Sequence, residues 1–252
     1  MRFFLDLSYC GTNFNGWQNQ QKQKNTRCVQ RVIEQSIFTL TRTVHELVGC
    51  GRTDTGVHAI HYIAHTDSNE ELDNPKFLYK LNNILPEDIV IHVIRKTHEK
   101  AHARFDALSR SYVYKLHLEK SPFPDLSFLY TYKIPDLEVL NKAVELLLDY
   151  RDFNSFCKTR TDVKTTLCNI ESAYWIKNDS NEFEFHIKAD RFLRGMIRLI
   201  VGMCLDVDRN KLTLDDVKKA LDKKERLPRN WSVPAIGLFL CDIKYPEEIY
   251  KL

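Results

Sequence analysis

The sequence predicts an α+β protein with a largely antiparallel sheet. Segments in which apolar residues alternate outnumber those with apolar residues at helical spacing, and they follow one another at hairpin-like distances. The chain has 252 residues, 43% of them hydrophobic and 28% charged, which suits a globular protein with a buried core. A boundary near residues 104–108 is expected to divide it into two domains, 1–106 and 107–252.

Composition also excludes several classes of protein. The apolar run Leu199–Leu205 is far shorter than the roughly 20 residues that span a bilayer. Asp6 interrupts the apolar N-terminal stretch, so we expect no export signal, no membrane partner and a cytoplasmic location. The seven cysteines are scattered without CxxC spacing, which argues against disulfide frameworks and cysteine zinc sites.

In the first half, alternating apolar residues predict an opening strand at Phe3–Tyr9. Apolar residues at helical spacing predict a helix over about Val29–Thr41. The other expected elements are strands at Thr43–Val48, Ile60–His65 and Ile89–Lys96 and a short helix near Pro75–Asn83.

The second half repeats this pattern in kind. Asp136 is placed to cap a helix, and a largely apolar helix is expected from about Arg191 to Leu205. Thr213 and Asp216 form a capping-box start for an amphipathic helix that ends near Glu225. The expected strands are Ser111–Leu118, Glu171–Lys177, Glu182–Lys188 and Gly237–Lys244.

The segment Gly49–Ala59, GCGRTDTGVHA, carries the strongest chemical signal. One interpretation is a polar turn between two strands, because Asp and Thr side chains bond their own backbone and Gly supplies positive φ. The other is a tight loop that presents the carboxylate of Asp54 into a cleft, with Arg52 placed to contact a phosphate or a flipped base.

This segment closely resembles the GRTDAGVHA signature of the TruA family of tRNA pseudouridine synthases. Seven further motifs follow the family's order along nearly the whole chain, which makes coincidence very improbable. They are Tyr9-Cys10-Gly11 with Phe14 and Gly16-Trp17-Gln18, Val29-Gln30, Leu81-Asn82 with Leu85-Pro86, His102-Ala103-Arg104-Phe105 with Arg110-Ser111-Tyr112-Val113-Tyr114, Asp152-Phe153-Asn154-Ser155-Phe156, Phe192-Leu193-Arg194 through Val201-Gly202, and Pro234-Ala235 with Gly237-Leu238.

The resemblance implies a fold, an activity and partners. The fold is two similar α/β halves that share a long, largely antiparallel sheet, with helices on one side and a central active-site cleft. The activity is isomerisation of uridine to pseudouridine at positions 38, 39 and 40 of the tRNA anticodon stem-loop, by a homodimer that uses neither cofactor nor metal.

The resemblance also implies residue roles. Asp54 matches the catalytic aspartate, Tyr112 the active-site tyrosine and Arg198 the arginine that pairs with the aspartate. Arg52 and Leu238 match other cleft positions. The family's usual residues differ at four positions that bear on tRNA docking: Thr55, Gly195, Leu199 and Cys168.

These residue types suit the reaction. The uridine leaves the stack at a cost of a few kcal/mol, which stacking on an aromatic ring such as Tyr112 offsets. The Asp54 carboxylate acts either as a nucleophile toward C1′ or as a base on the sugar, and both roles require the ionised form. A neighbouring arginine, proposed as Arg198, favours that form.

Arg191, Arg194 and Arg198 stand at i, i+3 and i+7, which places them on one face of the predicted helix. Such a stripe is either a solvated face or a wall that contacts RNA, and the family resemblance favours RNA, with Arg191 and Arg194 as substrate-binding residues. The excess of Lys and Arg over acidic residues between His186 and Asn230 agrees with phosphate contacts.

Two other functions, a zinc hydrolase and an RNA-binding module, fit parts of the sequence. His98-Glu99-Lys100-Ala101-His102 matches the HExxH zinc-hydrolase motif, but it follows an expected strand and lacks the long helix that the motif requires. A catalytically silent RNA-binding module would use the same aromatic and basic residues, yet it has no need of Asp54.

Overall fold

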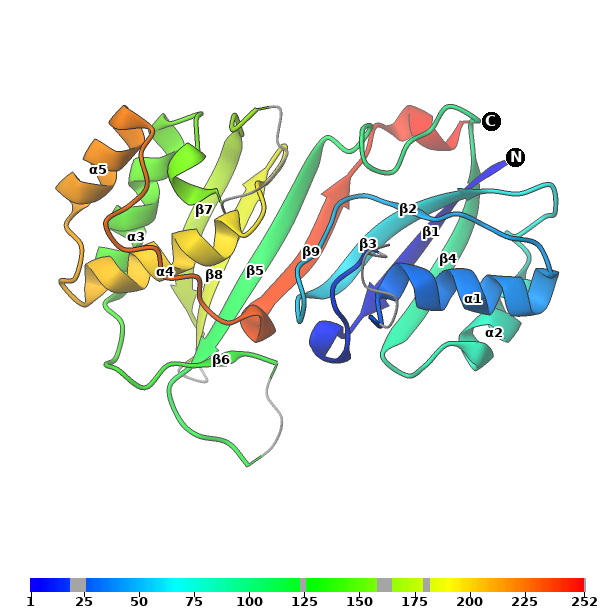
Figure 1. The fold of residues 1–252 in the computed structure, drawn as a ribbon, viewed down its shortest axis with the longest axis horizontal. Helices are drawn as coiled ribbons and strands as arrows, with labels where there is room; N and C mark the ends of the chain where they lie inside the picture. Colours follow the sequence, from blue (N-terminus) through cyan, green and yellow to red (C-terminus); the bar gives the residue numbers. More distant parts are fainter. Residues whose placement is uncertain (19–25, 123–125, 158–164, 179–181, 252) are drawn as a thin grey trace. The chain divides into compact units, whose positions relative to one another are not determined.

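The computed structural model describes residues 1–18, 26–122, 126–157, 165–178 and 182–251. The chain forms two compact units (Figure 1): unit 1 comprises Met1–Arg110 with Phe239–Leu252, and unit 2 comprises Ser111–Leu238. The division differs from 1–106 and 107–252 chiefly in the C-terminal segment, which returns to unit 1.

Unit 1 is built on a mainly antiparallel sheet. Its strands lie in the order β4 (Ile89–Thr97), β1 (Arg2–Tyr9), β3 (His58–Asp67) and β9 (Leu238–Lys244). The first two pairings are antiparallel, whereas β9 runs parallel to β3, with Phe239 opposite His58. The short strand β2 (Val48–Gly49) pairs with β3.

Helices α1 (Val29–Thr41) and α2 (Pro75–Ile84) cover one face of this sheet (Figure 1). Helix α1 follows the predicted bounds, because its apolar residues recur at helical spacing and bury Ile33 and Ile37 completely. Helix α2 begins where Asn74 accepts a hydrogen bond from the Lys76 amide.

The strand predicted at Thr43–Val48 is wrong for most of its length. Only Val48 and Gly49 pair with β3. Before them, the Leu47 amide donates to the Glu34 carboxylate (2.9 Å) and the Glu46 carbonyl accepts from the Thr66 hydroxyl (2.9 Å). Side chains rather than a strand ladder satisfy these backbone groups, so β propensity did not produce a strand.

The strands of unit 2 lie in the order β5 (Ser109–His117, in this unit from Ser111), β8 (Phe183–Ala189) and β7 (Ile170–Lys177). Strands β7 and β8 are antiparallel, and β6 (Phe128–Leu129) runs parallel to β5. Its helices are α3 (Leu137–Glu145), α4 (Met196–Asp208) and α5 (Leu214–Lys223).

Both predicted caps of this unit are confirmed. The Asp136 carboxylate accepts from the amides of Glu138 and Val139 at the start of α3. Thr213 and Asp216 form a reciprocal capping box at the start of α5.

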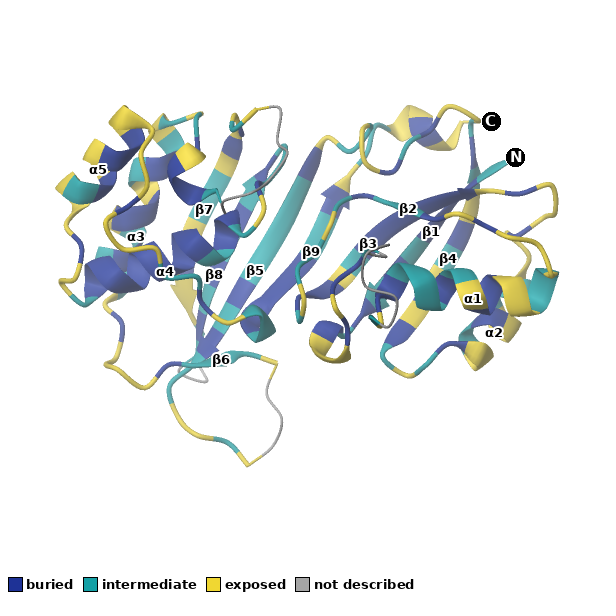
Figure 2. Ribbon diagram, viewed as in Figure 1, coloured by how far each residue is buried: buried dark blue, intermediate teal, exposed yellow. Residues whose placement is uncertain are grey.

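The helix predicted from Arg191 begins five positions later, at Met196. Gly195 adopts the left-handed conformation (φ 71°) directly before it, and the Asp190 carboxylate fixes the preceding chain by accepting from the amides of Asn169 and Arg191. In α4 every residue except Arg198 is buried (Figure 2).

The expected α+β class is confirmed, since strands in mostly antiparallel pairings combine with helices in both units. Among the described residues, no helix has the length and apolar character needed to cross a membrane.

Candidate active site

Asp54 lies on the short loop that connects β2 to β3 in unit 1. The residue is half-buried, and its backbone carbonyl accepts a hydrogen bond from the Val57 amide (3.1 Å). Gly56 has φ 79°, a conformation that favours glycine, so the chain turns sharply just after the carboxylate. The segment therefore turns sharply between two strands, and the half-buried Asp54 lies in this turn.

The end of β1 and the segment that follows it pack against this loop. The Tyr9 hydroxyl lies 2.8 Å from the hydroxyl of Thr53, the residue directly before Asp54. Gly16 has φ 86°, and a Cβ there would stand 2.3 Å from the Thr53 carbonyl oxygen. Glycine is thus required at position 16, because any side chain would displace the loop that carries Asp54.

Two stacked aromatic rings hold the first part of the loop. The rings of Trp17 and Tyr62 are stacked with centroids 4.1 Å apart, and the Tyr62 hydroxyl donates to the Gly51 carbonyl (2.5 Å). A Cβ at Gly49 would stand 2.0 Å from that hydroxyl oxygen. At Gly51 a Cβ would meet no atom within 4 Å, so the tightness expected on this side of Asp54 comes from Gly49.

Arg110 is a residue of this site that sequence reasoning matched to a family motif but gave no role. Its guanidinium donates to the carbonyls of Cys50 (3.0 Å), Arg104 (2.6 Å) and Ala107 (3.1 Å). The side chain thereby ties the loop that carries Asp54 to the chain segment before β5. In the sequence, only its place in that motif distinguishes Arg110, because an arginine on a strand is usually solvated.

His58, which follows the loop, is also structural. It is buried, its Nδ1 atom accepts from the Gly11 amide (3.1 Å), and its ring stacks on Phe239 with centroids 4.6 Å apart. The imidazole therefore anchors the start of β3 to both neighbouring segments. Arg52, by contrast, is exposed on the same loop.

The remaining predicted site residues lie in unit 2. Tyr112 is half-buried on β5, with its ring edge-on to Phe192 at 5.2 Å. Tyr114, two positions on, is fully buried and donates to the Pro234 carbonyl (2.9 Å), and burial raises the pKa of its hydroxyl. The structure therefore distinguishes the two tyrosines: Tyr114 packs in the core, whereas Tyr112 retains exposed surface.

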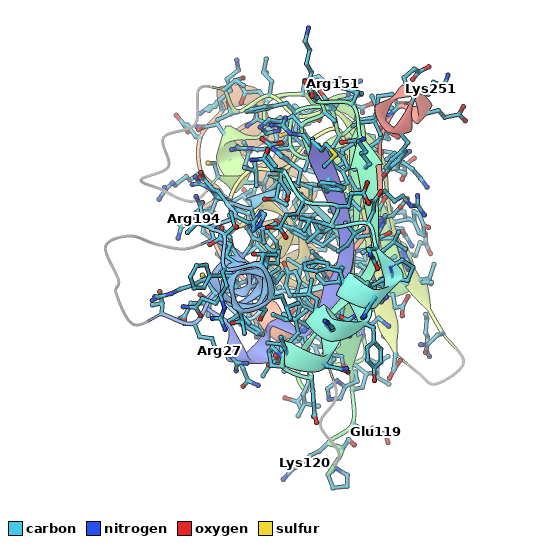
Figure 3. All side chains as sticks on the ribbon, turned by 90° about the vertical axis from the view of Figure 1, so that its right-hand side faces the viewer. Arg27, Glu119, Lys120, Arg151, Arg194 and Lys251 are labelled. Atoms are coloured by element: carbon cyan, nitrogen blue, oxygen red, sulfur yellow. The ribbon has the colours of Figure 1, made fainter. Side chains whose placement is uncertain are left out.

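Arg198 and Leu238 occupy defined positions in the same unit. The Arg198 Nε atom donates to the Val233 carbonyl (2.6 Å), which orients the guanidinium, and Leu238 is buried at the start of β9. Arg191 is half-buried and Arg194 is exposed (Figure 3). Because both precede α4, the predicted helical stripe of three arginines is wrong.

The HExxH segment does not form a zinc-binding helix. Strand β4 ends at Thr97, and His98–His102 continues as a turn, so the two histidines lack the one-turn helical spacing that the motif needs. His102 is engaged with its own backbone: its Nδ1 atom accepts from the amides of Arg104 and Phe105.

The other two histidines of β3, His61 and His65, contact different partners. His61 lies between Asp6 (3.5 Å) and Asp242 (3.4 Å), and its hydrogen bond with Asp6 raises its pKa. His65 accepts from the Ala103 amide (3.1 Å). The expectation of a strand at Ile60–His65 is confirmed.

A family model and full-length relatives give the same description for the proteins that this chain resembles. A family model described as tRNA pseudouridine synthase matches residues 7–106 and 143–246. A protein named tRNA pseudouridine synthase A from Parabacteroides distasonis is 45% identical over 100% of this chain and 98% of its own length. The protein of that name from Bacteroides thetaiotaomicron is 41% identical over 99% and 93%, and tRNA pseudouridine synthase A 2 from Clostridium tetani is 36% identical over 96% and 97%.

Proposed function

This chain belongs to the TruA family of tRNA pseudouridine synthases, and on that premise we propose that Asp54 is the carboxylate with which it isomerises uridine at positions 38, 39 and 40 of the tRNA anticodon stem-loop. The protein is an isomerase that converts uridine to pseudouridine. The N1–C1′ bond breaks, the base turns, and C5 bonds to C1′. N1 gains the proton that C5 loses, so the reaction balances without an external reactant.

The observation that best supports Asp54 is the construction of its loop. Hydrogen bonds at Gly51 and Thr53 and the close packing at Gly16 fix the backbone on the N-terminal side of the carboxylate, and Gly56 turns the chain on the other side. A rigid backbone with a half-buried carboxylate favours catalysis, because a prepositioned group loses little entropy when the substrate binds.

We assign the other residues by the family resemblance. Tyr112 is proposed to stack on the flipped uridine, which offsets the cost of leaving the helix. Arg198 is proposed to pair with the Asp54 carboxylate. The substrate-binding residues are proposed to be Arg52, Arg191, Arg194 and Leu238.

Partners and location follow from the same membership. We propose tRNA as the substrate, a homodimer as the active assembly and the cytoplasm as the location. The mass of the protein in solution, from light scattering, tests the dimer.

Tritium release from tRNA that carries [5-³H]uridine tests the catalytic role, with no metal added. Wild type is expected to release tritium. The rate of release by Asp54→Asn is expected to be more than about 10³-fold lower, because no other group replaces the carboxylate. Asp73→Asn, at an exposed aspartate of the same unit, is the matched control and should retain activity.

Filter binding of the same tRNA accompanies the assay. Tight binding without release by wild type would refute the enzymatic proposal for this substrate and favour the RNA-binding module. Undiminished tritium release by Asp54→Asn would refute the catalytic role of Asp54 but not the enzymatic function of the protein.

A further inference from the structure

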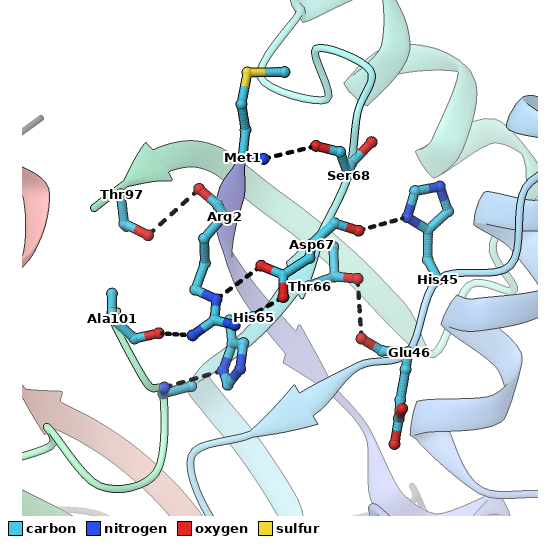
Figure 4. Close-up of polar contacts among 11 residues, drawn as sticks. Met1, Arg2, His45, Glu46, His65, Thr66, Asp67, Ser68, Thr97 and Ala101 are labelled. Carbon is cyan, nitrogen blue, oxygen red and sulfur yellow. Dashed lines mark hydrogen bonds and ion pairs between the residues drawn. The ribbon is translucent and has the colours of Figure 1, made fainter. Parts of the chain in front are cut away.

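Side chains form hydrogen bonds with several backbone groups of the turn Ala101–Asp106 in unit 1. Arg2 donates to the Ala101 carbonyl (2.7 Å), a contact that can be followed in Figure 4. The Ala103 amide donates to the Nδ1 atom of His65 (3.1 Å). The Tyr245 hydroxyl donates to the Ala103 carbonyl. Side chains from β1, β3 and the C-terminal segment therefore fix the first half of the turn.

The second half is fixed from within. The Nδ1 atom of His102 accepts from the amides of Arg104 (3.1 Å) and Phe105 (3.3 Å). The His102 amide donates to the Asp106 carboxylate (2.8 Å), which closes the turn. The backbone of the two tip residues is thereby set before any ligand arrives.

The tip also adjoins the catalytic loop of the same unit. One nitrogen of Arg110 contacts both the Arg104 carbonyl (2.6 Å) and the Cys50 carbonyl (3.0 Å). The two carbonyls therefore lie next to each other, on either side of one guanidinium nitrogen. Cys50 is two residues before Arg52 on the loop that carries Asp54.

The side chains at this tip face solvent. Phe105 is 74% exposed and Arg104 is exposed, with the guanidinium carbon 5.7 Å from the Phe105 ring centroid. The His102 ring lies 4.3 Å from the Phe105 ring on one side. A single exposed phenylalanine needs no explanation by itself. An exposed aromatic ring and a cation on a fixed turn beside the catalytic loop have the composition of a single-stranded RNA contact.

We propose that Phe105 and Arg104 bind the nucleotide that flanks the target uridine, with Phe105 stacked on its base and Arg104 against its phosphate. The inference rests on the proposed function, and it adds a contact outside the catalytic residues. When a uridine leaves the stack, its neighbour loses a stacking partner, and a fixed aromatic ring replaces that partner at little entropic cost.

Equilibrium binding of an anticodon stem-loop RNA, measured by fluorescence anisotropy across a range of salt concentrations, tests this contact. Phe105→Ala is expected to weaken binding about tenfold at every salt concentration, within the range for loss of one base stack. Arg104→Ala is expected to weaken binding and to lower the slope of log K against log salt by about 0.7–0.9, the value for one lost phosphate contact.

Tyr79→Ala provides the matched control, because Tyr79 is another exposed aromatic residue of unit 1 (69%) and lies on α2. It should bind RNA like wild type. Phe105→Leu keeps an apolar side chain without a ring, and it should bind as weakly as Phe105→Ala if stacking is the contact.

Wild-type affinity for Phe105→Ala overturns the proposal. A change in solution mass for that variant with unchanged RNA affinity would assign the surface to a contact between protein copies and would overturn it equally. The binding assay does not depend on turnover. A wild type that binds but releases no tritium therefore refutes the enzymatic function and leaves this contact standing.

Discussion

His65 shows how one buried side chain links the sheet to the turn that follows β4. It is 4% exposed, and burial, aided by the nearby charge of Arg2, lowers its pKa to about 4 from an ordinary 6.5. Only the neutral imidazole accepts the Ala103 amide proton at Nδ1. Protonation of His65 therefore breaks a bond that holds the turn.

This linkage predicts a pH dependence of stability. Between pH 6.5 and about 4 the unfolded chain binds a proton at His65 that the folded chain does not, so the stabilisation is complete above pH 6.5 and is lost as the pH falls through this window. The loss attributable to His65 is about 2 kcal/mol between pH 7 and pH 5. Urea unfolding of wild type and His65→Gln at both pH values measures it. Equal pH dependence in the two proteins would contradict the assignment.

At the scale of elements, an asparagine on a helix fixes the outermost strand in each unit. Asn82 of α2 donates to the Ile91 carbonyl (2.8 Å) and accepts from the Ile91 amide (2.9 Å) on β4. Asn141 of α3 makes the same pair with Trp175 on β7 (3.1 and 2.8 Å). Each strand stands at one end of the strand order, so the asparagine satisfies an edge that would otherwise be open.

Replacement of Asn82 by alanine should destabilise the protein by about 2 kcal/mol, because two hydrogen bonds at a part-buried backbone are lost. Asn83→Ala is the control, since Asn83 is exposed on the same helix. The midpoint of urea unfolding measures both. Alanine favours a helix more than asparagine does, so helix propensity cannot cause the predicted loss. An unchanged midpoint for Asn82→Ala, or an equal loss in Asn83→Ala, would contradict the strand contact as its cause.

The spacing of apolar residues predicts some helix bounds and misses others. Helix α1 was predicted to the residue because its apolar spacing is long and regular. The start of α4 was wrong because Gly195 takes a left-handed conformation and Asp190 binds the preceding amides, and neither contact is visible in apolar periodicity.

At the scale of the whole molecule, the C-terminal segment completes unit 1. Phe4 on β1 is 2% exposed, and the rings of Tyr245 and Tyr250 lie edge-on to it at 5.4 and 6.2 Å. Arg95 of β4 lies over the Tyr250 ring, and Ile249 is buried. The last residues of the chain thus cover a sheet surface formed by its first residues.

A chain that ends at Lys244 should therefore lose about 3 kcal/mol or more of stability, because Tyr245 and Ile249 are removed and Phe4 is uncovered. A chain that ends at Tyr250 is the control, and it should unfold like the full chain. Thermal unfolding followed by circular dichroism compares the three proteins. An unchanged midpoint for the shorter chain would show that the segment does not stabilise unit 1.

The sequence by itself determined the α+β class, most of the elements and the family, because apolar periodicity, capping residues and ordered motifs are local properties of the chain. It also singled out Asp54 and its loop, whose role remains a proposal. Only the tertiary structure decided the return of β9 to the first unit, the difference in burial between Tyr112 and Tyr114, and the contacts of Arg110. These depend on which backbone carbonyls and rings come together from distant segments, and contacts of that kind leave no periodic trace in the sequence.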